Sequence, residues 1–194
     1  MSNPPNWTDV PGRRAFFREG FAKLIRPLGD LIERRMGLLP ERKLLRPPGA
    51  LPEAEFLDTC YRCGSCVEVC PADAIFLLKQ GDAKVADTPV IDPDLAACVV
   101  CDDLACMKVC PSGALKLVAG PELIRMGVAR VDQALCVRTS GEDCTLCIDQ
   151  CPMGSSALRT VGTGPPLVLD GCVGCGVCQH VCPTKPKAIV VDPV

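Results

Sequence analysis

Sixteen cysteines, all of them after residue 59, constrain this chain of 194 residues more than any other feature. They form four motifs of four, and a proline follows the last cysteine of each motif. Motif 1 is Cys60, Cys63, Cys66 and Cys70; motif 2 is Cys98, Cys101, Cys106 and Cys110; motif 3 is Cys136, Cys144, Cys147 and Cys151; motif 4 is Cys172, Cys175, Cys178 and Cys182. Motifs 1 and 4 share the spacing C-x2-C-x2-C-x3-C-P, whereas motif 2 has a longer second gap and motif 3 a longer first gap.

This spacing predicts iron–sulfur clusters. An iron–sulfur cube has four iron corners, and each corner takes one soft thiolate ligand. Three cysteines in a short loop can bind three corners, while the fourth cysteine, three residues further on, points toward a neighbouring cube. The proline that follows ends the local turn. We therefore expect four [4Fe–4S] clusters, each of which takes its fourth ligand from a partner motif.

The spacing leaves two arrangements of partner motifs open. Because motifs 1 and 4 share one spacing and motifs 2 and 3 are the variants, we expect a nested arrangement, in which motifs 2 and 3 form an inner module between the two halves of an outer module. The expected ligand sets are Cys60, Cys63, Cys66 and Cys182; Cys172, Cys175, Cys178 and Cys70; Cys98, Cys101, Cys106 and Cys151; and Cys136, Cys144, Cys147 and Cys110. The alternative is sequential pairing, of motif 1 with motif 2 and of motif 3 with motif 4.

Two other uses of clustered cysteines compete with this interpretation. Structural zinc binds C-x2-C pairs, but usually as two knuckles separated by a longer spacer, and four repeats ending in C-x3-C-P do not divide into such knuckles. A disulfide framework needs an oxidising compartment, and we find no secretory signal in the sequence. A zinc-stabilised interaction module remains the alternative from a different class of protein.

Short β-branched or alternating runs accompany the motifs, at residues 90–91, 128–131, 167–169 and 189–191. They predict hairpin strands around each cluster loop, with a helical turn or two between them. Motifs 1 and 4 also have the spacing of bacterial two-cluster ferredoxins. We therefore expect an α+β fold in which residues 45–194 form a four-cluster domain of two ferredoxin-like modules.

At this point the chain resembles a known family, the NapG/MauM-type ferredoxins, over about residues 45–191. The resemblance is carried by RPPGAL at 46–51, CYRCG at 60–64, CMKVCPSGAL at 106–115, RMGV at 125–128 and the order of the four unequal motifs. It implies an electron carrier between a membrane quinol-oxidising partner and a downstream acceptor. More distantly, the layout is similar to electron-transfer subunits of molybdenum and tungsten oxidoreductases. The alternative function is therefore the small subunit of such a cytoplasmic complex.

The composition excludes several other classes of protein. One histidine in the whole chain removes most acid–base and zinc-hydrolase mechanisms, and no nucleophile–base pair or nucleotide fingerprint is visible. The net charge of −2 gives no indication of a nucleic-acid partner. The chain is therefore expected to catalyse nothing alone. Asp102 and Asp103, inside motif 2, are expected to lower the reduction potential of a nearby cluster.

Residues 1–44 are expected to form a separate N-terminal arm. Gly12 to Arg18 looks like a twin-arginine export motif, but Glu19, Lys23, Arg26 and Asp30 interrupt the apolar stretch that export requires. We therefore expect a cytoplasmic protein.

Apolar residues at helical spacing predict that this arm is an amphipathic helix. Residues 1–50 hold ten Lys and Arg against five Asp and Glu, so the arm is basic. It could dock on a partner subunit such as a catalytic oxidoreductase, lie on an anionic membrane surface, or pack on its own acidic body. The proline-rich segment 37–58 is expected to be an extended tether.

Overall fold

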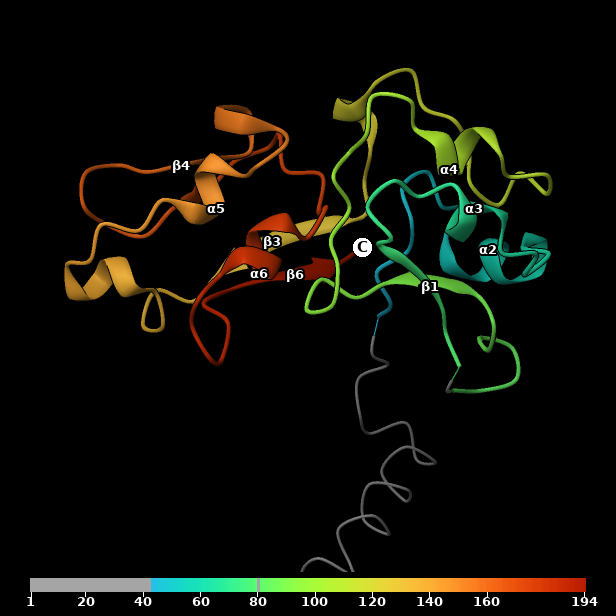
Figure 1. Cartoon of the computed structure of the whole chain (residues 1–194), viewed down its shortest axis with the longest axis horizontal. Helices are drawn as coiled ribbons and strands as arrows, with labels where there is room; N and C mark the ends of the chain where they lie inside the picture. The colour runs from blue at the N-terminus through green and yellow to red at the C-terminus, as the bar shows by residue number, and fades with distance from the viewer. Residues whose placement is uncertain (1–42, 80) are drawn as a thin grey trace, which may run out of the picture. The chain divides into compact units, whose positions relative to one another are not determined.

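The computed structural model describes residues 43–79 and 81–194, and residues 43–194 form one compact unit (Figure 1). The elements in chain order are α2 (Glu53–Thr59), α3 (Ser65–Glu68), β1 (Ile75–Leu77), β2 (Pro89–Ile91), α4 (Ala105–Lys108), η1 (Pro121–Leu123), β3 (Gly127–Val131), η2 (Val137–Ser140), α5 (Leu146–Asp149), η3 (Gly154–Ser156), β4 (Leu158–Arg159), β5 (Leu167–Val168), α6 (Val177–Val181) and β6 (Ile189–Pro193). This mixture of short helices and strands agrees with the expected α+β class. The predicted helical arm lies outside the described residues.

The unit has two lobes that follow the order of the chain. Helices α3 and α4, which carry motifs 1 and 2, contact each other in one lobe, and α5 and α6, which carry motifs 3 and 4, contact each other in the other (Figure 1). The nested arrangement expected from the spacing is therefore wrong. Each motif packs against its neighbour in sequence because the connecting strand pairs fold the chain back locally. The likeness in spacing between motifs 1 and 4 creates no contact by itself.

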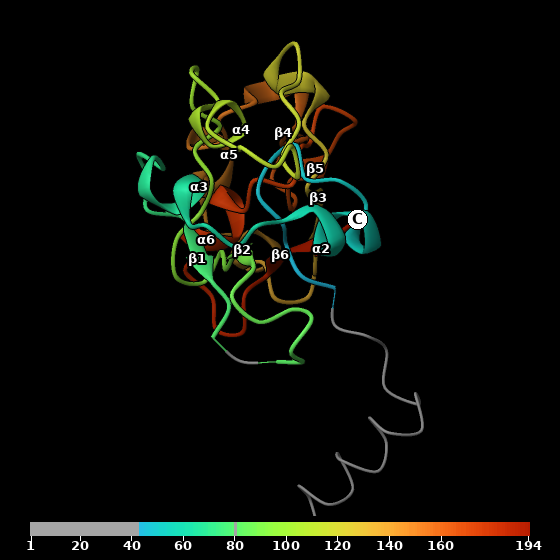
Figure 2. The ribbon, with the colours of Figure 1, turned by 90° about the vertical axis from the view of Figure 1, so that its right-hand side faces the viewer.

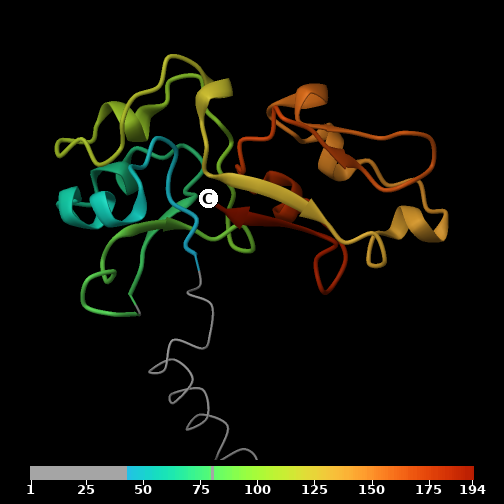
Figure 3. The same ribbon diagram turned by 180° about the vertical axis from the view of Figure 1, so that it is seen from behind.

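The described residues of the two lobes include three two-stranded antiparallel sheets. Strand β1 pairs with β2, β4 with β5, and β3 with β6, the longest ladder, which Figure 3 shows side by side. The strands predicted at 90–91, 128–131 and 189–191 are confirmed, and that at 167–169 is confirmed over its first two residues. Their inward side chains, such as Ile75, Ile91 and Ile189, are buried, which explains the β-branched composition of the runs.

The described part of the predicted tether belongs to the folded unit instead. The segment from Lys43 runs beside β2, where the Leu45 carbonyl accepts a hydrogen bond from the Ile91 N–H at 2.8 Å (Figure 2). Arg46 is buried, and its guanidinium lies 4.7 Å from the ring centroid of Phe56 on α2. The expectation of an extended tether through residue 58 is wrong there, because the arginine and the apolar side chains around it gain burial against the lobe.

The buried core includes cysteine sulfurs as well as hydrocarbon. One apolar cluster surrounds Phe56 and Ile124 and contains Cys66 and Cys106, and a second contains Leu158, Ile189, Cys178 and Cys182. In the described part of the chain, no helix is long and apolar enough to cross a membrane. The cysteine side chains therefore form part of the packed interior of both lobes.

Candidate metal-cluster sites

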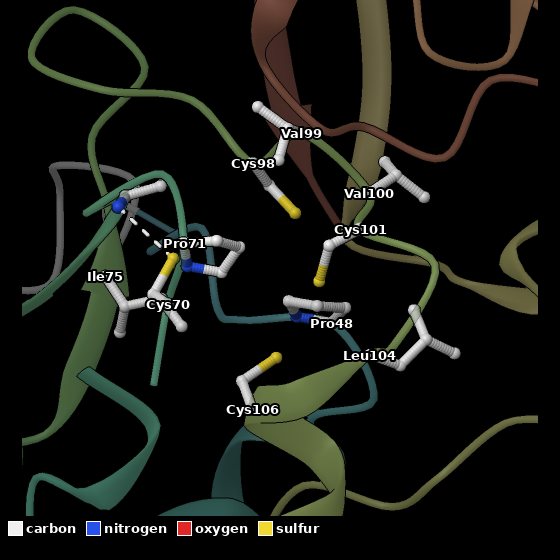
Figure 4. A pocket seen from close by; sticks show the side chains of 11 residues that line it. Pro48, Cys70, Pro71, Ile75, Cys98, Val99, Val100, Cys101, Leu104 and Cys106 are labelled. Atoms are coloured by element: carbon white, nitrogen blue, oxygen red, sulfur yellow. Dashed lines mark hydrogen bonds between the residues drawn. The ribbon is translucent and has the colours of Figure 1, made fainter. Parts of the chain in front are cut away.

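Four cavities in the folded unit are each lined by four cysteines. The sets are Cys60, Cys63, Cys66 and Cys110 in cavity 1; Cys98, Cys101, Cys106 and Cys70 in cavity 2; Cys172, Cys175, Cys178 and Cys151 in cavity 3; and Cys136, Cys144, Cys147 and Cys182 in cavity 4. The space around each quartet, including the part that is open to solvent, is about 290 to 390 Å³. Figure 4 shows cavity 2, where the sulfurs of Cys98, Cys101 and Cys106, from one segment, and of Cys70, from another, point into the same space.

Every cavity takes three cysteines from one motif and one from a partner, as expected, but the partners differ from those of the nested arrangement. Cys182 lines cavity 4 rather than the cavity of motif 1, and Cys70 lines cavity 2 rather than that of motif 4. Cys110 and Cys151 likewise line cavities 1 and 3. In each lobe two short helices lie against each other, so the fourth cysteine of one motif faces the loop of the adjacent motif.

Backbone conformation makes the tight cysteine loops possible. Three motifs have a left-handed residue directly before the second cysteine: Arg62 with φ 56°, Val100 with φ 51° and Gly174 with φ 73°. A left-handed conformation is unfavourable for a β-branched residue, so Val100 is strained by the loop. A second left-handed residue, such as Gly64 at φ 81°, precedes the short helix that carries the third cysteine. Together, the two left-handed residues bend the backbone so that the loop curves around its cavity.

Hydrogen-bond donors lie close to several of the cysteine sulfurs. Backbone N–H groups of Arg62, Ala74, Leu115 and Ala129 donate to the sulfurs of Cys60, Cys70, Cys110 and Cys172 at 3.4 to 3.5 Å. Three hydroxyl oxygens lie near sulfurs as well: Ser65 at 3.4 Å from Cys63, Ser112 at 3.6 Å from Cys110 and Thr184 at 3.2 Å from Cys182. Because a metal-bound thiolate has no proton, these hydroxyls would donate to it.

These hydrogen bonds lower the pKa of some thiols. The Ser65 hydroxyl lowers the pKa of Cys63 below its ordinary value, and the Ser65 N–H acts in the same direction. For Cys182, burial acts to raise the pKa, but hydrogen bonds from Thr184 and from backbone N–H groups outweigh it, so the pKa is lowered. Cys63 lines cavity 1 and Cys182 lines cavity 4. These hydrogen bonds therefore stabilise negative charge on one sulfur in each of the two cavities.

Burial raises the pKa of other thiols. It raises the pKa of Cys66 and Cys147 to about 11, and that of Cys98, Cys106 and Cys175 to about 12. Nearby cysteines add to the effect, since their negative charges repel one another. Four ionised thiolates around an apolar cavity would be very costly without a cationic partner.

The donor set in each cavity fits an iron–sulfur cluster. Four soft thiolates surround an otherwise mainly apolar volume, and thiolates are the usual ligands of such clusters. The sulfurs surround each volume rather than meeting at a point, and within residues 43–79 and 81–194 no group of three or more His, Cys, Asp or Glu side chains is arranged to hold one metal ion. The quartets therefore suit a group with several metal atoms.

The four cavities lie in the order 1, 2, 3, 4. Cavities 1 and 2 are adjacent because Cys66, on α3, lines cavity 1 and Cys70, two residues after the end of α3, lines cavity 2. Cavities 3 and 4 are adjacent in the same way, because Cys178 on α6 lines cavity 3 and Cys182, directly after α6, lines cavity 4. The two lobes meet between cavities 2 and 3, where the Cys98 N–H donates to the Cys175 carbonyl and the Met126 N–H to the Val173 carbonyl.

Four side chains at cavities 1 and 4, the two ends of this order, were not predicted from the sequence as site residues. Arg62 lines cavity 1 and Arg138 lines cavity 4, while Ser112 and Thr184 contact the cysteine that the partner motif contributes to each. A local signal existed for the hydroxyls, since Cys-Pro-Ser and Cys-Pro-Thr occur in motifs 2 and 4 only. Arg138 had no such signal, because its position beside cavity 4 depends on the fold.

Comparisons with known proteins agree with the two-lobed description. A model described as a 4Fe-4S dicluster domain matches residues 59–114, which contain motifs 1 and 2. A model described as a 4Fe-4S binding domain matches residues 134–154 and 169–185, which contain motifs 3 and 4.

Relatives with similar sequences are ferredoxin-type proteins. The chain is 36% identical to the ferredoxin-type protein NapG of Escherichia coli, over 94% of this chain and 86% of the relative. It is 38% identical to the methylamine utilization ferredoxin-type protein MauM of Methylorubrum extorquens, over 79% and 74% of the two chains. One solved structure, a formate dehydrogenase–heterodisulfide reductase–formylmethanofuran dehydrogenase complex of Methanospirillum hungatei, matches at 22% identity and a TM-score of 0.28 over 71% of this chain and 50% of the other, which is too weak to support an argument.

Proposed function

Because the chain belongs to the family of NapG and MauM ferredoxin-type electron-transfer proteins, we propose that it relays electrons through four [4Fe–4S] clusters held in the four cavities. The observation that carries this proposal is the set of four cysteine quartets, which uses all sixteen cysteines once. A bound cluster accepts and releases one electron at a time. The ligands would be the cysteines that line each cavity, three from one motif and one from its neighbour in sequence.

The protein's own residues support this role by holding the cysteines and excluding water. Leu104, Val100 and Ile75 border cavity 2, and Leu158 and Val173 border cavity 3, so apolar side chains surround the thiolates there. Backbone N–H groups aimed at sulfur stabilise the negative charge that each site accumulates on reduction. The order of cavities gives a path from one end of the unit to the other.

We infer that redox protein partners approach at the two ends of this path. Cys63 is exposed at cavity 1, and Tyr61 beside it is 71% exposed. At cavity 4, the lining residue Leu146 is 42% exposed. The family resemblance favours a quinol-linked partner at one end and an acceptor oxidoreductase at the other.

The first experiment is a count of iron and acid-labile sulfide on the full chain purified without oxygen, with an EPR spectrum after reduction by dithionite. We expect about sixteen of each per chain and coupled signals from reduced clusters. Zinc without sulfide would overturn the electron-transfer proposal and leave a structural interaction module. Counts near eight would indicate that one lobe binds no clusters.

The cytoplasmic location remains a prediction from charges in the N-terminal sequence. It is tested by fusing residues 1–44 to a reporter that becomes active only after twin-arginine export. No reporter activity, compared with a fusion to an established export signal, supports a cytoplasmic protein. Reporter activity that disappears when Arg13 and Arg14 are changed to Lys would overturn the prediction.

A further inference from the structure

Charged side chains are distributed unequally among the four cavities. Arg62 lines cavity 1 and Arg138 lines cavity 4, which are the two ends of the path. Among the described residues, those that line cavities 2 and 3 include cysteines and apolar or small side chains but no charged one. Each end cavity therefore has a permanent positive charge in its wall, and the inner cavities do not.

Arg138 is held beside cavity 4 by hydrogen bonds to its own surroundings. Its guanidinium is buried and donates to the carbonyl oxygens of Gly164, Gly162 and Cys144 at 2.8 to 3.2 Å. It also donates to a carboxylate oxygen of Asp143 at 3.0 Å. The Asp143 side chain is 92% exposed, so water and salt screen its charge much more than that of the buried guanidinium.

Arg62 is held in a similar way at cavity 1. Its guanidinium donates to the carbonyl oxygens of Cys60, Lys84 and Ala86 at 2.8 to 3.3 Å. In the described part of the chain this arginine has no carboxylate partner within ion-pair distance. Its positive charge is therefore not neutralised by a neighbouring acidic side chain.

Hydroxyl donors show the same division between end and inner cavities. Ser65 and Ser112 lie beside sulfurs of cavity 1, and Thr184 lies beside a sulfur of cavity 4. The equivalents of Ser112 and Thr184, two residues after the last cysteine of motifs 1 and 3, are Ala72 and Met153. Backbone N–H donors occur in both kinds of cavity, whereas the described linings contain arginines and hydroxyls at the end cavities and none at the inner cavities.

We propose that Arg62 with Ser112 and Arg138 with Thr184 set the clusters of the end cavities 1 and 4 at higher reduction potentials than those of the inner cavities 2 and 3. The physical reason is that reduction adds negative charge, which a nearby cation and a donated hydrogen bond to sulfur both stabilise. The described walls of the inner cavities contain no arginine and no hydroxyl side chain, and Asp102, an exposed acidic residue, directly follows Cys101 of cavity 2 in the sequence. This inference rests on the proposed function.

The consequence is that an electron on the protein occupies an end of the path. Transfer from one end cluster to the other passes through the two inner clusters, which have lower reduction potentials and are therefore less easily reduced. The two end clusters each lie near one partner. Transfer across the lobe boundary then depends on which partner removes an electron or supplies one. The four residues are positioning residues, because they act on the clusters through charge and hydrogen bonds.

The test is an EPR-monitored redox titration of the full chain with all clusters assembled. Arg62→Gln and Ser112→Ala should each lower the potential of one and the same cluster, although the two residues belong to different motifs. Arg138→Gln and Thr184→Ala should each lower the potential of a second cluster. In the unsubstituted protein, these two clusters should have the highest potentials of the four.

Three further variants separate a charge effect from structural damage. Arg138→Lys should retain the potential that Arg138→Gln loses, because it retains the positive charge. Arg125→Gln should move no potential, since this arginine lines none of the four cavities. Ala72→Ser, which places a hydroxyl beside Cys70 as Ser112 lies beside Cys110, should raise the potential of an inner cluster.

The inference is overturned if the glutamine and alanine variants leave all four potentials unchanged. It is also overturned if the affected clusters have the lowest potentials, or if Arg138→Lys lowers the potential as far as Arg138→Gln does. Iron and sulfide are counted before each titration. An unsubstituted chain that lacks clusters contradicts the proposed function, whereas variants that retain four clusters with unaltered potentials contradict only this inference.

Discussion

The backbone N–H of Cys98 donates a hydrogen bond to the carbonyl oxygen of Cys175 at 3.0 Å. This bond joins the first cysteine of motif 2 to the second cysteine of motif 4, and so links a wall of cavity 2 to a wall of cavity 3. The same contact region includes a hydrogen bond of 3.0 Å from the Gln179 side-chain amide to Asp94. The two lobes therefore meet where their inner cavities lie, which makes one continuous path of four.

The pairing of motifs can be tested with cysteine-to-serine variants. Cys63→Ser and Cys110→Ser should damage the same cluster, because both cysteines line cavity 1. Cys70→Ser, from the same motif as Cys63, should damage a different cluster because it lines cavity 2. The measurement is the EPR signal and iron content of each variant. If Cys63→Ser and Cys182→Ser eliminated one common signal, the nested pairing would be restored.

Close backbone packing at Gly174 predicts that a methyl group there is poorly tolerated. Its φ is 73°, and an added Cβ would lie 2.4 to 2.5 Å from backbone atoms of Gly127. We expect Gly174→Ala to lower the free energy of unfolding by about 3 kcal/mol, from strain and overpacking together. The control is Gly154→Ala, with φ 56° and open space around its Cβ, which should cost about 1 kcal/mol. Equal losses, measured by anaerobic guanidinium unfolding, would contradict the contact with Gly127.

The buried Arg46 should contribute strongly to the stability of the first lobe. Its guanidinium donates to Glu53, to the Thr88 hydroxyl at 2.8 Å and to the Pro89 carbonyl at 2.9 Å. Arg46→Met removes these donors, and we expect it to lower the free energy of unfolding by about 2 to 3 kcal/mol.

The matched control for Arg46→Met is Arg130→Met. The Arg130 side chain and that of its partner Asp192 are 63% and 59% exposed, so solvent screens their ion pair and little or no loss is expected. Both variants are compared by the guanidinium midpoint followed by circular dichroism. A loss for Arg130→Met as large as that for Arg46→Met would show that burial is not the cause.

Removal of the clusters should loosen both lobes. Cys66 and Cys106 lie in one apolar core, and Cys178 and Cys182 in the other, so their sulfurs are held close together inside the fold. After iron is removed with a chelator, we expect α3, α4, α5 and α6 to lose protection against hydrogen exchange first, since each is shorter than six residues and carries a cysteine. Retained protection in these helices would mean that apolar packing alone maintains the lobes. A sample treated in parallel without chelator provides the reference.

The ligand chemistry and the local form of each site could be predicted from the amino-acid sequence alone. Soft thiolates in fours predict iron–sulfur clusters, and three cysteines within one loop predict the three-plus-one division that every cavity shows. The strands at residues 90–91 and 128–131 were equally predictable, because alternation and β-branching act over a few neighbouring residues. All of these properties depend on residues close together in the chain.

The motif that supplies each fourth cysteine, and the cavities that lie at the ends of the path, could not be predicted in this way. Similar spacing suggested that Cys70 belongs with motif 4, yet the packing of α3 against α4 brings Cys70 to motif 2. Arg138 is two residues from Cys136 in sequence, but the Gly162 and Gly164 carbonyls that hold its guanidinium come from more than twenty residues away. Such contacts result from the packing of distant segments, and spacing along the chain does not contain that information.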